Sequence, residues 1–379
     1  MIRVRHAADI EADVNHPYER TGREPDFGQM LKVLRGQAPD RPVLYEFAIN
    51  WRLIRAFADP GLDPEDQNDP ANPYIATSWR NMGFDYLMAG ATWRLAMGER
   101  AKDQTVSLNE GALITDRASF EAYDWSWPDE SHFTFIREAR LPDGMKIITS
   151  TPGGLLENVV QLVGYERLCY LSLDDPALVA DVFKAVGARL VRYYEICAGY
   201  DNVGACCHND DWGFKTQTML SPEAMRQHVI PWHRRVVQVI HAAGKPALLH
   251  ACGNLEAVMD DVIDGIGYEA KHSFEDSILP VEEAYERWAG RIAILGGLDV
   301  DFLCRSSPDR IAARSLAMLE RTDGRGGYAL GSGNSIPEYV PDDHFLAMTG
   351  VALERGRLKL SKLQQAQAEQ GAAHRSWGD

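Results

Sequence analysis

The stretch Gly244–Asn254, GKPALLHACGN, decides the fold and the chemistry that we expect of this chain. The apolar residues Ala247–Leu249 are typical of a buried strand that ends in His250 and Cys252. Because side chains alternate along a strand, His250 and Cys252 point the same way. An imidazole and a thiol so placed could supply half of a zinc site. The alternative is a hydrogen-bonded core histidine beside a small buried thiol.

The same pattern recurs on both sides of this stretch, where five units in succession read strand, polar cluster, helix. The polar clusters are His208–Asp211, His250–Asn254, Lys271–Ser273, Gly296–Asp299 and Gly331–Asn334. We expect the helices that follow them at about 221–243, bent at Pro231, then at 255–266, 280–288, 308–321 and from Pro341 onward. Such alternation predicts an α/β fold with a parallel sheet.

Several polar strand ends that arrive together favour a closed (β/α)8 TIM barrel, with a site at its carboxyl face, over a doubly wound open sheet. No glycine-rich nucleotide-binding motif occurs in these turns.

The first half of the chain is less regular. An amphipathic segment at Asp26–Gly36 predicts a helix that covers or closes the barrel. Pro42–Ala48 is expected to be the first barrel strand, with Glu46 facing the cavity. Further strands are expected at Gly83–Gly90 and Met145–Ser150, and a helix is expected from Asp175 to about Ala198. We divide the chain into an N-terminal helical extension (1–40), the barrel (41–358) and a polar C-terminal tail (359–379).

Composition limits the class of function. The 379 residues are 45% hydrophobic and 25% charged, as in an ordinary globular protein, and the formal net charge of −16 disfavours a nucleic acid or an anionic membrane as partner. The six cysteines show no disulfide framework, so we expect reduced thiols and a cytoplasmic protein. No apolar run approaches the ~20 residues of a membrane span, and no secretion signal precedes the first strand.

The polar strand ends supply the candidate site residues. Candidate catalytic groups are Asp210, Asp211, His272 and Asp299, and candidate substrate-binding groups are Glu46, Asn254, Ser332 and Asn334. Each aspartate could instead lie at the N-terminus of a helix, and His272 could be a surface histidine. His250 and Cys252 are the candidate metal ligands.

Taken together, these clusters resemble the uroporphyrinogen decarboxylase superfamily over roughly residues 26–358. The resemblance is carried by Asp210–Gly213, Ser221–Glu223 with Pro231, His250–Asn254, Gly296–Asp299, and Gly331–Asn334 with Ile336 and Pro337. Within the superfamily, His-x-Cys-Gly resembles the cobalamin-dependent methyltransferases of coenzyme M and related thiols. The resemblance implies a (β/α)8 barrel, a zinc held by His250 and Cys252, a small-molecule substrate and a corrinoid carried by a partner protein.

The sequence departs from the family pattern in two places. The second cysteine ligand of the methyltransferases falls at Ser332, and a hydroxyl is a poor zinc ligand, so another donor is needed. The candidates for it are Glu46, Asp210, Asp211, His272, Cys206 and Cys207. The arginine-rich segment of the decarboxylases is replaced by Tyr45–Arg52, where Glu46 would repel a polyanionic porphyrinogen.

Three functions therefore stay open. The first is a zinc-dependent methyltransferase that moves a methyl group between a corrinoid protein and a thiol or other small acceptor. The second is a cofactor-free decarboxylase of a porphyrinogen-like or other small carboxylate, in which Asp210 or Asp211 holds the substrate. The third is a non-catalytic relative that only binds a small ligand. Methyl transfer is the function we prefer, because zinc can lower the pKa of a thiol enough for it to attack at neutral pH.

Overall fold

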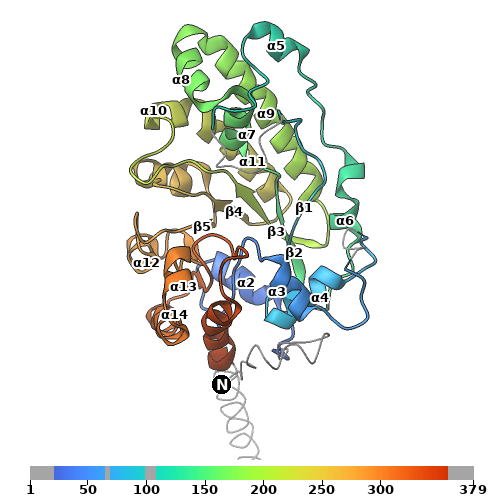
Figure 1. Ribbon diagram of the computed structural model, residues 1–379, viewed down its shortest axis with the longest axis vertical. Coiled ribbons are helices and arrows are strands. Elements are labelled where there is room, and N and C mark those ends of the chain that lie inside the picture. Colours follow the sequence, from blue (N-terminus) through green and yellow to red (C-terminus); the bar gives the residue numbers. More distant parts are fainter. Residues whose placement is uncertain (1–20, 65–68, 99–107, 357–379) are drawn as a thin grey trace, which may run out of the picture.

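A single parallel sheet forms the centre of the molecule. The computed structural model describes residues 21–64, 69–98 and 108–356 (Figure 1). The seven strands of the sheet follow one another in chain order, and each pair of neighbours is parallel. They are β1 (Tyr86–Gly90), β2 (Lys146–Ser150), β3 (Val203–Asn209), β4 (Ala247–His250), β5 (Ala270–His272), β6 (Ala293–Leu295) and β7 (Tyr328–Ala329). The predicted α/β class with a parallel sheet is confirmed.

Helices connect the strands and flank the sheet, as parallel strands require (Figure 1). They are α3 (Trp51–Phe57), α4 (Tyr74–Met82), α5 (Arg117–Ala122), η1 (Glu130–Phe133), α6 (Thr134–Glu138), α7 (Leu155–Val163), α8 (Tyr165–Asp174), α9 (Pro176–Cys197), α10 (Pro222–Ala224), η2 (Met225–Val229), α11 (Ile230–Ala242), η3 (Glu256–Val258), η4 (Asp261–Ile266), α12 (Val281–Trp288), α13 (Val300–Arg305) and α14 (Pro308–Thr322), and residues 342–356 are also helical. Within the described ranges, no helix combines the length and the apolar character that a membrane crossing needs.

The longest helix begins where its sequence predicts. Asp175 caps α9 by accepting a hydrogen bond from the Leu178 N–H, and Pro176 occupies the first turn, where a missing N–H costs nothing. The apolar stripe of α9 is buried and packs beside α11. The prediction of a helix from Asp175 to about Ala198 is confirmed.

Two predicted helices are not regular α-helices. In the segment 221–243, the Ile230 N–H bonds to the carbonyl of Met225, five residues earlier, so a π-helical turn (η2) separates α10 from α11. Pro231, which has no N–H to donate, follows directly. The segment 255–266 forms only a 3₁₀ turn (η3) and a π-helical turn (η4), and the poor helix former Gly265 lies inside the latter.

The N-terminal helix α2 (Phe27–Leu34) closes the amino end of the sheet. Asp26 caps it by accepting from the Gly28 N–H. Its Phe27 ring lies against Gly204 at the start of β3, where a Cβ would come within 2.3 Å of the ring. The predicted helix at Asp26–Gly36 is confirmed. The domain boundaries stay predictions: residues 1–20 of the N-terminal extension and the whole polar tail lie outside the described residues.

The predicted first strand, Pro42–Ala48, is an extended segment rather than a full strand. On one side it runs parallel to the end of β7, with an isolated bridge between Leu44 and Leu330. On the side of β1, the Tyr86 hydroxyl accepts from the Glu46 N–H and donates to the Glu46 carbonyl, both at 2.7 Å. A side-chain hydroxyl thus takes the place of ladder hydrogen bonds, which local sequence could not reveal.

The variant Tyr86→Phe tests whether the Tyr86 hydroxyl replaces the hydrogen bonds of a regular strand pair. The variant leaves two buried backbone groups of Glu46 without their partner, and each unsatisfied group costs about 1–3 kcal/mol. We expect the free energy of unfolding in urea to fall by at least about 2 kcal/mol. Tyr339→Phe is the control, because that ring is 72% exposed, and its change should stay within about 0.5 kcal/mol. Equal stability of both variants would contradict the assignment.

Candidate functional site

The carboxyl ends of β3, β4 and β5 lie side by side, and they bring several predicted site residues together. In the parallel register, Asn209 pairs with His250 and His250 pairs with His272. Paired residues of neighbouring strands point to the same face, so the two imidazoles lie side by side. The predicted gathering of polar strand ends is therefore seen for these strands.

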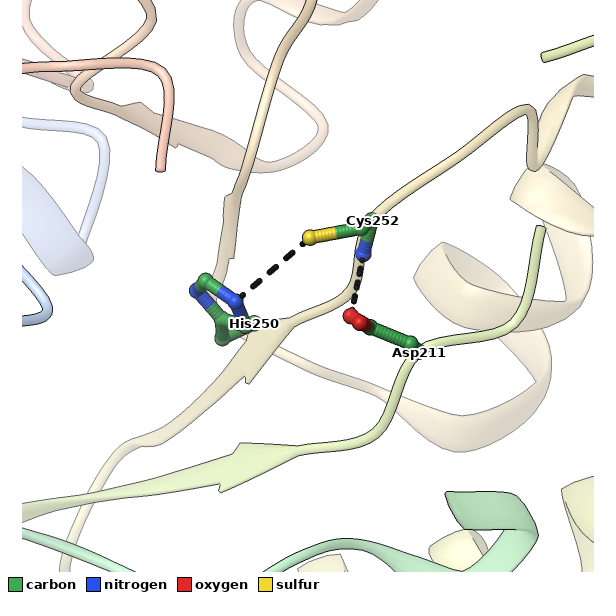
Figure 2. A group of neighbouring side chains, drawn as sticks. All are labelled: Asp211, His250 and Cys252. Atoms are coloured by element: carbon green, nitrogen blue, oxygen red, sulfur yellow. Dashed lines mark hydrogen bonds between the residues drawn. The ribbon is translucent and has the colours of Figure 1, made fainter. Parts of the chain in front are cut away.

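Asp211, His250 and Cys252 form a cluster at and just beyond these strand ends (Figure 2). One ligand atom from each residue lies within 4.8 Å of the other two. The His250 Nε2 atom is 3.7 Å from the Cys252 Sγ atom, and Asp211 accepts from the Cys252 N–H at 2.9 Å. The cluster thus combines an imidazole, a thiol and a carboxylate, all of them half-buried or buried.

Close contact between two loops fixes the cluster. Gly253 has a φ of +85°, and a Cβ there would lie 2.0 Å from the carbonyl oxygen of Gly213. Only glycine allows this approach. The Gly213 N–H donates to the Cys252 carbonyl at 3.1 Å, so the loop that carries Asp211 is tied to the loop that carries Cys252. The glycine of the His-x-Cys-Gly element is therefore needed for the geometry of the site.

The thiol of Cys252 lies in a polar but poorly solvated environment. Burial, with a further contribution from Asp211, raises the pKa of the Cys252 thiol to about 12. Asn334 donates a hydrogen bond to Sγ from its amide at 3.2 Å, and Ser273 Oγ lies at 3.5 Å. Without a cation the thiol is protonated at neutral pH, and a bound metal ion would reverse that preference.

Two neighbours of the cluster, Phe47 and Lys271, were not among the predicted site residues. The Phe47 ring stacks on His250, with centroids 4.1 Å apart. Lys271 is buried, its ammonium group donates to the Ser273 carbonyl at 2.6 Å, and burial lowers its pKa to about 8. Phe47 follows Glu46 in the sequence, and Lys271 lies in the polar cluster Lys271–Ser273, but neither signal distinguishes a neighbour of the site from a core residue.

His272 and Ser332 support the cluster without joining it. His272 Nδ1 lies 2.8 Å from His250 Nδ1, and His272 Nε2 lies 3.1 Å from the Ser332 carbonyl oxygen. The Ser332 hydroxyl donates to Glu46 at 2.6 Å, and its N–H donates to the same carboxyl group at 2.8 Å. Glu46 therefore faces the interior as predicted, but it contacts Ser332 and not the donor cluster.

Asp210, which we predicted to be catalytic, joins neighbouring parts of the chain through hydrogen bonds. Its buried carboxylate accepts from the N–H groups of Leu156 and Glu157 at the start of α7, from the Trp212 indole and from His233. Four donors satisfy it, and its favourable position at a helix N-terminus explains the burial of the charge. These contacts give Asp210 a structural role, and its catalytic role stays a prediction.

Asp299 also acts as a helix cap, and Asn254 makes a local turn contact. Asp299 accepts from the N–H groups of Phe302, in the first turn of α13, and Asp276. Asn254 accepts from the Glu256 N–H. Asp299 nevertheless lines, together with Asn334, a cleft of about 990 Å³ at the carboxyl end of the sheet. Their predicted catalytic and substrate-binding roles stay predictions.

The donor set fits a zinc ion. Ligands at about 2.0–2.3 Å from a tetrahedral zinc lie roughly 3.5 Å from one another. The distance of 3.7 Å between His250 Nε2 and Cys252 Sγ is close to this value. The three atom types are those of zinc sites, and three protein ligands leave the open position that a catalytic site requires.

The chain is an α/β protein with a helix-flanked parallel sheet, and a candidate metal cluster lies at the carboxyl ends of its strands. The model of the uroporphyrinogen decarboxylase (URO-D) family matches residues 138–354, more than half of the chain. The chain therefore belongs to that family. No curated protein matches the sequence significantly.

A solved structure supports the fold. A methyltransferase from Methanosarcina mazei superimposes with a TM-score of 0.62 at 17% identity, over 86% of this chain and 97% of its own. At this identity the likeness shows the fold alone. Xylanase B from Clostridium stercorarium F9 superimposes with a TM-score of only 0.34 at 12% identity, over 54% of this chain and 78% of its own, which is too low to indicate a shared fold.

Burial of Glu46 predicts that the free energy of unfolding depends on pH. Burial raises the pKa of Glu46 from 4.5 to about 8, so the folded protein holds this proton while the unfolded chain releases it. The contribution of Glu46 to stability is therefore lost as pH rises from about 4.5 to about 8, by up to about 1.4 kcal/mol per pH unit. Glu46→Gln imitates the protonated acid and does not titrate.

We expect the free energy of unfolding of Glu46→Gln, relative to wild type, to rise between pH 5 and pH 8 in urea titrations. Glu338→Gln is the control, because the Glu338 side chain is 62% exposed. A flat difference for Glu46→Gln across that range would show that Glu46 is already ionised in the folded protein.

Proposed function

We propose that this protein is a zinc-dependent methyltransferase that moves a methyl group between a corrinoid protein and a thiol or another small acceptor. The observation that carries the proposal is the cluster of Asp211, His250 and Cys252 at the carboxyl ends of the strands. The corrinoid would be carried by a partner protein, and we assign the activity to the cytoplasm, in keeping with six unpaired cysteines.

We further propose that the chain closes as a (β/α)8 barrel, with Pro42–Ala48 in the first strand position. The parallel bridge of Leu44 to Leu330 on one side and the hydroxyl contacts of Tyr86 on the other support this closure. A closed arrangement would place the cluster at the barrel mouth, where enzymes of this fold carry their sites.

In this proposal His250 Nε2, Cys252 Sγ and the Asp211 carboxylate hold the zinc. Asp211 takes the role that the family resemblance assigns to a cysteine at the position of Ser332. The Ser332 hydroxyl is committed to Glu46 at 2.6 Å, which supports a ligand set without it. When bound, zinc would act as a Lewis acid that lowers the pKa of an acceptor thiol.

Other side chains would stabilise the Cys252 thiolate and position the methyl acceptor. The Asn334 amide donates to Cys252 Sγ at 3.2 Å, and such a bond favours the ionised sulfur. The buried ammonium of Lys271 adds a positive field. Asn334 also lines the large cleft, so an acceptor bound in the cleft would lie next to the cluster.

The cluster is also the reason for preferring methyl transfer over the alternatives. A cofactor-free decarboxylase has no need of a donor set that fits zinc, and Asp210, one of its two candidate residues, is satisfied by four protein donors. A relative that only binds a small ligand would not need its imidazole, thiol and carboxylate within 4.8 Å of one another.

Metal analysis tests the ligand set. We expect protein purified without a metal-binding tag to hold stoichiometric zinc, as measured by mass spectrometry of the elements. Cys252→Ser and Asp211→Asn should each lose it, because each removes one of three protein ligands. Ser332→Ala is the matched control and should keep its zinc, since the Ser332 hydroxyl is bonded to Glu46.

Activity is tested with methylcobalamin and a panel of small thiols, by following the corrin absorbance as the methyl group leaves cobalt. Wild type and Ser332→Ala should demethylate the cofactor in a thiol-dependent reaction, whereas Cys252→Ser should not. Stoichiometric zinc in Cys252→Ser, or equal rates in the two variants, would contradict the proposal.

A further inference from the structure

His250 and His272 share one hydrogen bond between like atoms. Their Nδ1 atoms are 2.8 Å apart, and the ring centroids are 4.9 Å apart at an interplanar angle of 47°. Both side chains are buried. Between two neutral imidazoles, one Nδ1 must carry the proton and donate, and the other must accept with its lone pair.

The Ser332 carbonyl decides which ring donates. A carbonyl oxygen can only accept, and it lies 3.1 Å from His272 Nε2, so this nitrogen carries a proton. Both rings are buried, and burial disfavours the charged imidazolium, so each ring holds a single N–H. The Nδ1 atom of His272 is therefore the acceptor, and His250 donates from its own Nδ1.

This tautomer leaves the Nε2 atom of His250 without a proton. With its proton on Nδ1, the ring presents a bare lone pair at Nε2, and this atom faces Cys252 Sγ at 3.7 Å. The contact is consistent with a protonated thiol that donates to Nε2 and accepts from the Asn334 amide. Phe47, stacked on His250, holds the plane of the ring.

We propose that His272 is a positioning residue that fixes the tautomer of His250, so that Nε2 is ready to bind a metal ion before the ion arrives. This proposal rests on the proposed function only in taking the cluster of Asp211, His250 and Cys252 as the metal site.

Ser332, whose carbonyl fixes the tautomer of His272, is itself held by several hydrogen bonds. The Ser332 carbonyl also accepts from the Gly297 N–H at 2.8 Å, and both the N–H and the hydroxyl of Ser332 are bonded to Glu46. The contacts thus run from Glu46 through Ser332 and His272 to His250. His272 contacts the ligand His250 directly, and removal of a partner that orients a metal ligand in this way typically changes metal affinity about 10–100-fold.

The first test reads the tautomer directly in metal-free protein. In ¹⁵N-histidine NMR spectra, with the His250 signals identified by their absence in His250→Asn, we expect wild type to carry its proton on Nδ1. His272→Phe fills the ring volume but cannot accept, so His250 should lose this preference. In His272→Asn the side-chain oxygen can lie near the former Nδ1 position and restore it. His228→Phe, in the helix layer against Phe183, is the control and should match wild type.

The second test measures the affinity for Co²⁺ from the thiolate-to-cobalt absorption. We expect His272→Phe to bind about 10–100-fold more weakly than wild type. His272→Asn should recover much of the loss, and a residue that served only packing would show no such recovery. An Nε2–H tautomer of His250 in wild type, or equal Co²⁺ affinities of wild type and His272→Phe, overturns the proposal.

The two tests separate this inference from the function. If His250 carries its proton on Nδ1 and loses that preference in His272→Phe, while the protein methylates no thiol, the inference stands and the function fails. If the protein is an active zinc methyltransferase but His272→Phe changes neither tautomer nor affinity, the inference fails and the function stands.

Discussion

Every buried polar group at the carboxyl edge of the sheet needs a partner, and the site depends on how this requirement is met. Asp210 ties the end of β3 to the start of α7 and to His233 in α11. Glu46 ties the extended segment to Ser332. The strand ends are thus joined by directional hydrogen bonds, which fix positions more closely than apolar packing does. The donor cluster owes its geometry to these fixed ends.

The sequence predicted the parallel sheet and the gathering of polar residues that form the candidate site, because apolar runs that end in polar residues mark strand ends locally. It could not separate Asp210 from Asp211. The two are adjacent, so their side chains diverge, one toward α7 and the other toward Cys252. Which of them is structural depends on a helix N-terminus more than fifty residues away in the chain. The same holds for Asp299, whose cap on α13 looks in sequence like a carboxylate at a strand end.

The elements that differed from prediction did so through contacts that local sequence does not contain. Pro42–Ala48 has the composition of a strand, but on one side the Tyr86 hydroxyl satisfies its backbone. The helix around Pro231 has the right periodicity, yet the missing N–H of proline is accommodated by a π-helical turn. Composition describes what a segment prefers, and tertiary partners decide which of its hydrogen bonds are made.

The absence of a second cysteine need not mean the loss of a metal. One imidazole, one thiolate and one carboxylate carry the same formal charge as one imidazole and two thiolates, so Asp211 can stand in for a cysteine at Ser332 without changing the charge of the site. A carboxylate oxygen is a harder donor than a thiolate and leaves more positive charge on a bound zinc. Lys271, buried beside the cluster, adds to that positive field. Both effects would favour the anionic form of whatever enters the open position, so the proposed zinc site, with a single thiolate, would remain suited to activating a thiol.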